Sequence, residues 1–192
     1  VAGNAAIALG RAVLGAAIAQ NTITNALTAA IEGSTASGST VTVESATNGD
    51  LTVIAVGGGG AQNFALGGSV AINEISGSIT ARLTNAVNVT SPGKITVKSH
   101  DDCTIFNATG TVQITTGSGA AIGAAISKNL ITRTITAASD GSTVSGNSVE
   151  ILSTTNADLD AITVGGTAAG NFALGGSVSL NDIGGTMEAR IA

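Results

Sequence analysis

The segment Asn63-Phe-Ala-Leu-Gly-Gly-Ser-Val70 decides the fold, because it returns without change at residues 171–178. The same shift, by 108 in the numbering, aligns residues 15–83 with residues 123–191 without a gap, and 39 of the 69 aligned positions are identical. A repeat of this kind is typical of architectures in which similar units stack on one another.

A shorter period lies inside this repeat. Its clearest marker is an asparagine that recurs at steps of 52, 56 and 52 in the numbering, at Asn21, Asn73, Asn129 and Asn181. The unit is therefore about 54 residues long. We interpret the chain as one β-solenoid segment of a longer protein, divided into the end of a preceding unit, three units and the start of a fourth: 1–14, 15–68, 69–122, 123–176 and 177–192.

Most of each unit has the alternation of a β strand with one buried face. Apolar and polar residues alternate in Val41-Thr-Val-Glu44 and in Ile95-Thr-Val-Lys98, which is the period of a pleated strand. Residues 14–31 also fit a helix, since apolar residues recur every four or five positions. Their copy at residues 70–83 contains Ser76-Gly-Ser78 and many β-branched residues, which disfavour a helix. We therefore predict an all-β, parallel β-solenoid.

Turn residues predict where each coil bends. Thr47-Asn-Gly-Asp50 and Gly141-Ser142 have the composition of turns between strands. We expect two or three coils per unit, each of about 18 to 27 residues, and a rod of about seven to eleven coils and 35 to 50 Å.

Composition excludes several classes of protein. The net charge is −5 without a basic run, so nucleic acid is not an expected partner. The single cysteine, Cys103, cannot form an internal disulfide or a cysteine-rich zinc site. Residues 103–127 carry no charge, but they include Asn107, Gln113 and several Thr and Gly. This content does not suit a membrane-spanning helix.

The recurring polar residues are interpreted as scaffold. A catalytic group needs to occur once, whereas a scaffold residue returns wherever its environment returns. We expect the four asparagines to be turn or ladder residues that form a structural ladder along the axis. Arg82 and Arg190 are expected to form surface pairs with Glu74 or Asp182, and Phe64 and Phe172 to fill the coils, since both the arginines and the phenylalanines are related by the long repeat.

One polar cluster is not repeated, Ser99-His-Asp-Asp-Cys103. Its side chains could bind a divalent cation, or form a nucleophilic Cys–His pair if they converged. We favour a structural interpretation, in which Asp101 and Asp102 are turn residues and His100 is exposed beside them. No catalytic, cofactor-binding or metal-binding residue is predicted.

The repeats resemble the β-helical passenger repeats of large bacterial filamentous adhesins. The similarity lies in Gly67-Gly-Ser-Val70, Ala81-Arg-Leu83, Gly141-Ser-Thr-Val144 and Val149-Glu-Ile-Leu-Ser153. The relatives would be filamentous haemagglutinin-like or leukotoxin-like proteins exported by type V secretion. The resemblance implies a right-handed parallel β-helix, an extracellular or cell-surface location, and a role as stalk or adhesin. It supplies no catalytic residues.

The first expectation for function is a non-catalytic rod or stalk of a bacterial adhesin or surface filament. Its partners would be adjacent coils of the same parent chain or further copies, with a host surface or a polysaccharide as the distal target. A second interpretation is a filament subunit that stacks end to end, since both ends cut through repeats. A third is a carbohydrate-active β-helix, a lyase or hydrolase, which would need a groove lined by charged residues.

Overall fold

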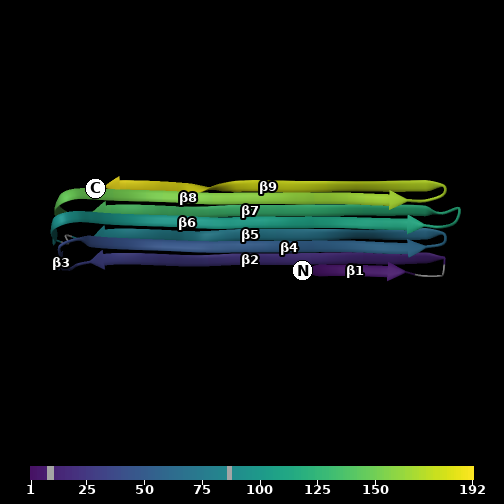
Figure 1. Ribbon diagram of the computed structural model, residues 1–192, viewed down its shortest axis with the longest axis horizontal. Coiled ribbons are helices and arrows are strands. Elements are labelled where there is room, and N and C mark those ends of the chain that lie inside the picture. Colours follow the sequence, from purple (N-terminus) through teal and green to yellow (C-terminus); the bar gives the residue numbers. More distant parts are fainter. Residues whose placement is uncertain (8–10, 86–87) are drawn as a thin grey trace.

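The chain forms long β strands joined by short turns (Figure 1). A computed structural model describes residues 1–7, 11–85 and 88–192. The strands in these ranges are β1 (Ala2–Ile7), β2 (Ala12–Glu32), β3 (Thr35–Ser37), β4 (Val41–Ala61), β5 (Phe64–Thr84), β6 (Asn88–Thr115), β7 (Ala120–Asp140), β8 (Thr143–Ala168) and β9 (Phe172–Ile191). Among the described residues, no helix has the length and apolar character needed to cross a membrane.

The strands belong to two sheets, and every pairing is parallel. One sheet has the order β2-β5-β7-β9, and we call it sheet B. The other, sheet A, contains β1, β4 and β6 in that order, with β3 and β8 also paired to β6. The chain alternates between the sheets, so that each coil contributes one long strand to each. The predicted all-β fold with parallel strands is confirmed.

The coils are longer than predicted. Asn21 pairs with Asn73, 52 residues later, and Ser99 pairs with Ser153, 54 residues later. One unit is therefore one coil, and the expectation of two or three coils per unit is wrong. Gly141-Ser142 is a turn, with Gly141 at a φ of 56°, but residues 47–50 lie in the middle of β4.

The shape differs from the predicted rod for the same reason. A strand of 21 residues is about 70 Å long, whereas each added coil lengthens the stack by only about 4.8 Å. The long dimension of the molecule therefore runs along the strands, as Figure 1 shows. The stacking axis, for which the sequence predicted about 35 to 50 Å, is much the shorter of the two.

The interior changes character along the strands. Near the turns at Gly33 and Gly141 it holds large aliphatic side chains, including Leu83, Val89, Ile95 and Val97. Toward the opposite turns it holds alanine, glycine, serine and asparagine. There the two sheets approach so closely that a β-carbon added at Gly57 would overlap the backbone oxygen of Gly68.

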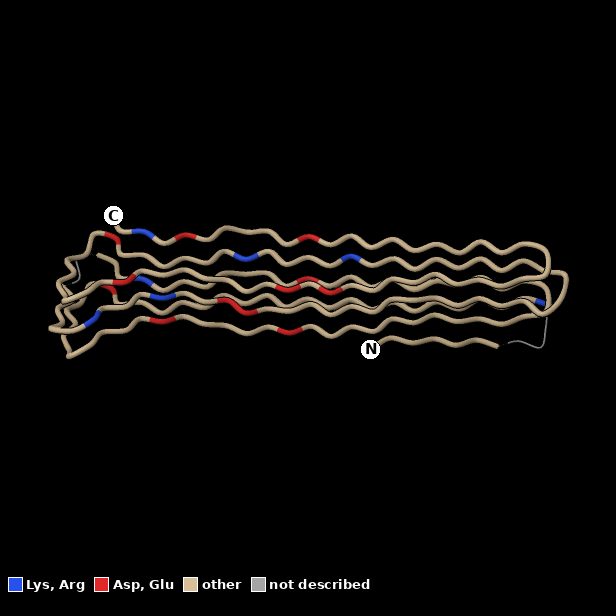
Figure 2. Tube along the Cα trace, turned by 45° about the horizontal axis from the view of Figure 1, so that its top comes forward, with Lys and Arg blue, Asp and Glu red and all other residues tan. Residues whose placement is uncertain are grey.

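Charge follows the same division. Residues 51–73, 103–127 and 161–181 contain no charged side chain, and we call this part of the molecule the uncharged end. Figure 2 shows the Asp, Glu, Lys and Arg residues gathered over the rest of the strands, with almost none in the right-hand third of the view.

Candidate functional site

The four repeated asparagines form a ladder along the stacking axis. They lie in the middle of β2, β5, β7 and β9, in register with one another. Each side-chain amide nitrogen donates to the amide oxygen of the next coil: Asn21 to Asn73 at 2.9 Å, Asn73 to Asn129 at 2.8 Å and Asn129 to Asn181 at 2.8 Å. The structure thus places these residues in the interior of strands and not at turns.

The ladder continues across the interior to sheet A. Asn129 Nδ2 also donates to Ser127 Oγ at 2.9 Å, and Asn107 Nδ2 of β6 donates to the same oxygen at 2.5 Å. Thr109 Oγ1 in turn donates to Asn107 Oδ1 at 3.0 Å. All four side chains are buried, and their mutual bonds offset the cost of removing them from water.

A buried ion pair lies farther along the strands. Arg133 of β7 and Asp101 of β6 are 3% and 0% exposed, and Arg133 Nε lies 3.5 Å from Asp101 Oδ1. Arg133 Nη1 donates to the backbone oxygen of Ser76 at 2.6 Å and to Oδ1 of Asn25. The guanidinium group therefore connects its own coil to both preceding coils.

Two glycines lie close to the Arg133 side chain. Gly77 stands between Asn25 and Arg133 in the register of sheet B, with a φ of 125°. A β-carbon there would overlap the backbone oxygen of Asn25. A β-carbon at Gly49 of β4 would lie 3.5 Å from Arg133 Nη2. Gly77 is therefore required by its own backbone conformation and by the closeness of Asn25, whereas Gly49 packs beside the Arg133 guanidinium group.

Cys103 belongs to the same buried group. Its Sγ donates to Asp101 Oδ2 at 3.3 Å. Burial first, and then the hydrogen bond and the negative charge of Asp101, raise the pKa of the Cys103 thiol to about 12. The thiol is therefore protonated at neutral pH, and a protonated thiol is a poor nucleophile and a poor metal ligand.

The side chains of the unrepeated cluster are divided between the two faces of their strand. They lie in the middle of β6, not in a turn as predicted, and the pleat sends Asp101 and Cys103 inward. On the outer face, His100 Nδ1 lies 2.8 Å from Thr154 Oγ1, and Asp102 Oδ1 accepts a hydrogen bond from Asn156 at 3.2 Å. In the described ranges, no three His, Cys, Asp or Glu side chains gather as metal ligands.

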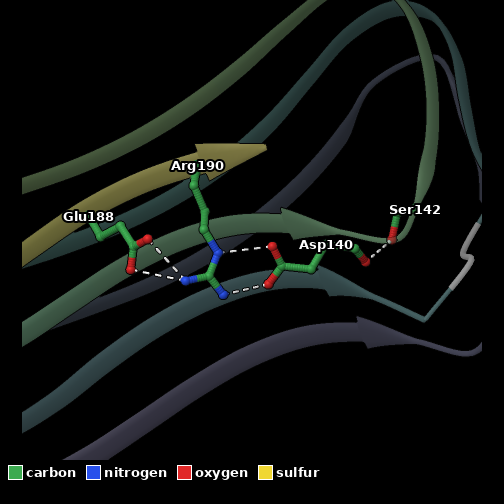
Figure 3. Close-up of polar contacts among 4 residues, drawn as sticks. All are labelled: Asp140, Ser142, Glu188 and Arg190. Atoms are coloured by element: carbon green, nitrogen blue, oxygen red, sulfur yellow. Dashed lines mark hydrogen bonds and ion pairs between the residues drawn. The ribbon is translucent and has the colours of Figure 1, made fainter. Parts of the chain in front are cut away.

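The surface arginines have other partners than predicted. Arg190 donates to Asp140 at 2.9 and 2.6 Å and to Glu188 at 3.0 Å (Figure 3). Arg82, the equivalent of Arg190 in the preceding repeat, pairs with Glu32. Glu32 and Asp140 are equivalent positions too, so the ion pair recurs with the repeat. The expected partners Glu74 and Asp182 are too far along β5 and β9 to serve.

Phe64 and Phe172 do not fill the coils. They are 36% and 52% exposed and start β5 and β9 at a position whose side chain points away from the interior. The neighbouring Ala65 is fully buried instead. The prediction of interior phenylalanines is wrong because alternation along the strand puts an alanine on the inner face.

The Arg133 group was missed from the sequence, although alternation contains the signal for it. In Ile131-Thr-Arg133-Thr-Ile135 the arginine has the same parity as two buried isoleucines, and a strand places residues of one parity on one face. Its partner could not be identified in this way, because Asp101 lies in the other sheet.

Comparisons with known proteins add no function. No family model, curated protein or solved structure matches this chain. The proposals below therefore rest on the chain's own residues.

Proposed function

We propose that the chain is a non-catalytic structural module, a stalk segment of an extracellular bacterial adhesin or surface filament. In this proposal the fold is a right-handed parallel β-helix whose units of about 54 residues pair into the 108-residue repeat. The observation that carries the proposal is the asparagine ladder, in which a recurring polar residue bonds each coil to the next.

The backbone pairing supports the same role. The strands β2 and β5 are in register along their whole length, from Ala12 with Phe64 to Glu32 with Thr84. The next pair, β5 and β7, is likewise in register from Phe64 to Thr84. A stack with unbroken hydrogen bonding between coils resists local opening, since each strand is fixed along its whole length. Such resistance suits a segment that must hold distal binding regions away from a cell surface.

Proteolysis and enzyme assays test this proposal together. We expect a non-specific protease to leave the folded chain intact, and we expect no turnover of acidic or neutral polysaccharides. Rapid cleavage within β4 to β7 would contradict a rigid stalk. If the chain does turn over a polysaccharide, and the surface variant His100→Ala loses that activity while its circular dichroism spectrum is unchanged, the chain is an enzyme instead.

A second candidate function is end-to-end assembly, and the direction of the ladder favours it. Each asparagine amide nitrogen donates toward the C-terminal coil, so a following coil would accept from Asn181 and a preceding one would donate to Asn21. In the last coil, Ile183 and Met187 are 52% and 57% exposed. They occupy the parity that is buried in earlier coils, where Ile131 and Ile135 are covered.

Light scattering and electron microscopy test end-to-end assembly. We expect particles that lengthen along the stacking axis as concentration rises. Met187→Lys should shorten them, because a charge would then lie in the covered interior. Particles of unchanged length in this variant would contradict the axial contact.

A further inference from the structure

We propose that the outer face of sheet B at the uncharged end is a lateral contact surface for a second copy of this chain. Outward-pointing aliphatic side chains form it, in two columns parallel to the stacking axis, with one residue of each column on every strand of the sheet. One column extends from Leu14 of β2 to Leu174 of β9, and the other from Ile18 to Val178, each through its register partners on β5 and β7. We call the two columns the aliphatic stripe.

The stripe is partly exposed in the central coils, where Leu66, Val70 and Ile122 are half-buried. Ile126 of β7 has neighbours on both sides and is still 44% exposed, while the next inward residue, Ser127, is fully buried. At the N-terminal coil, Leu14 and Ile18 are 72% and 70% exposed. A contiguous apolar patch of this kind on a surface that faces water often marks an interaction site.

At this end of β5, the side chains that point into the interior are small, and the aliphatic side chains point outward. Behind the stripe, β5 turns small residues such as Ala65, Ser69 and Ala71 inward, whereas Leu66 and Val70 face outward. The large aliphatic side chains are thus outside and the small and polar ones inside. In the other half of the strands this order is reversed. The outer face of sheet A at the uncharged end also exposes aliphatic side chains, among them Val112, Ile162 and Val164, so the stripe is one of two apolar faces at this end.

The two columns of the stripe contain no charged side chain. The nearest charged residues along β5 and β7 are Glu74 and Lys128, which lie beyond the end of the stripe. Figure 2 shows this region of the strands without acidic or basic residues apart from the turn. A partner can therefore cover the stripe without removing a charge from water, which is the main cost of burying a protein surface.

The relief of the stripe suits a second copy. Between the two columns lies a third, of small residues: Ala16, Gly68, Ala124 and Gly176. It forms a groove, and part of it is a hollow of about 320 Å³ beside Leu14, Leu66 and Gly68. A column of leucine or valine side chains from another copy can fill a groove of this kind, as facing sheets interdigitate in dry sheet-to-sheet contacts.

The stripe and its flanking residues together reach the lower size limit for a pair. With one outward position added on each side of the stripe, from Phe64 to Ile72, the strand extends about 27 Å, and four strands are about 19 Å wide, which amounts to roughly 500 Å² on each copy. Lys128, the register partner of Ile72, lies at the rim of this surface. Two copies would bury about 1,000 Å², the lower limit of a specific interface. Each further coil would extend the contact by about 4.8 Å.

A second copy explains the stripe better than a lipid surface does. Arg11 and the polar residues Gln62 and Asn63 lie at the turns that close the uncharged end. Inserting this end into a bilayer would bring them into hydrocarbon, where a cation and unpaired polar groups are costly. Face-to-face contact with a second copy leaves all of them in water.

Cysteine cross-linking tests the proposal and separates it from end-to-end assembly. Ala124→Cys places a thiol in the groove, and Thr132→Cys places one on the same outer face of β7 outside the stripe. Cys103 is buried, so the unaltered chain is the negative control and should not cross-link. Under mild oxidation we expect a covalent dimer from Ala124→Cys at least about tenfold faster than from Thr132→Cys, since only apposed thiols react. Equal rates would overturn the proposal.

Charge substitution supplies the second measurement. In sedimentation experiments, Ile126→Lys should weaken lateral association by at least about tenfold, because each copy would bury a charge. Thr132→Lys, which adds the same charge outside the stripe, should leave association unchanged, as should the axial variant Met187→Lys. Equal association of Ile126→Lys and Thr132→Lys would overturn the proposal. The proposal would also be overturned if the unaltered chain stays monomeric and binds phosphatidylcholine vesicles, and if Ile126→Lys abolishes that binding.

Discussion

In one half of each coil, large side chains such as Leu83, Val89 and Ile95 fill the space between the sheets, and the outer positions hold threonines and charged side chains. In the uncharged end the inner positions are occupied by small or polar residues such as Ser69 and Asn107, and the outer ones by aliphatic residues. One coil thus contains two solutions to the same packing problem. The difference teaches that parallel stacking can be maintained by apolar side chains or by small residues and a hydrogen-bonded ladder.

The largest effect is expected at Arg133, where the two halves of each coil meet. Arg133→Met would leave Asp101 as a buried, uncompensated charge and should lower the free energy of unfolding by about 3 to 5 kcal/mol. Arg82→Met removes an arginine from an exposed pair and should cost about 1 kcal/mol or less. Urea denaturation of the two variants measures the difference.

A double variant sharpens this prediction. Arg133→Met combined with Asp101→Leu removes both charges and should be more stable than Arg133→Met alone. If the double variant is the less stable of the two, then Arg133 stabilises the coils through its bonds to Ser76 and Asn25 and not through the charge of Asp101.

The contrast between the interiors predicts the next largest effect. Leu83 is fully buried, and Leu83→Ala should cost about 2 to 5 kcal/mol because it opens a cavity. Ile126→Ala removes a comparable side chain from the outer face of the uncharged end and should cost about 1 kcal/mol or less. Thermal unfolding at low protein concentration would compare them; equal losses would mean that the two ends are packed alike.

The ladder predicts a moderate effect. Asn73→Ala would leave Asn21 without an acceptor and Asn129 without a donor, and should cost about 1 to 3 kcal/mol. Asn48→Ala, at an exposed position of β4, is the matched control and should be within about 0.5 kcal/mol of the unaltered chain. A loss at Asn73 no greater than at Asn48 would show that the ladder does not stabilise the uncharged end.

The smallest effect concerns the surface pair in the charged half. The hydrogen bonds from Arg190 hold the pKa of Asp140 below its ordinary value of 3.8. A lowered folded-state pKa contributes stability above the ordinary pKa, and this contribution is lost as pH falls through the folded-state value. Acid titration of unfolding should therefore show a slightly smaller loss below about pH 4 in Asp140→Asn than in the unaltered chain. Parallel curves would mean that the pair is too exposed to matter.

The sequence predicted the parallel all-β fold because apolar alternation and a 108-residue repeat report backbone geometry directly. It did not predict the coil length, because residues such as Asn48 and Gly49 were interpreted as a turn. Gly49 is instead an inward position beside the Arg133 side chain from two coils later. Local composition cannot distinguish a glycine that turns the chain from one that lies on the inner face of a strand.

For the candidate site too, the sequence predicted some features and missed others. The asparagine spacing was sufficient to identify which residues lie in register, since they repeat. The partners of Arg82 and Arg190 were misassigned because residues that are close in sequence on a long strand are far apart in space. Glu32 and Asp140 lie 50 residues from their arginines, and only the full coil length brings them together.

The direction of the hydrogen bonds has a mechanical consequence. Backbone bonds between coils lie along the stacking axis, so a force that pulls the two ends of the stack apart would peel off a terminal strand one bond at a time. Each released coil would change from about 4.8 Å of folded height to about 180 Å of extended chain. A stalk built in this way would be short and stiff under small loads and would lengthen in large steps under strong ones, which single-molecule force spectroscopy would record as a regular sawtooth.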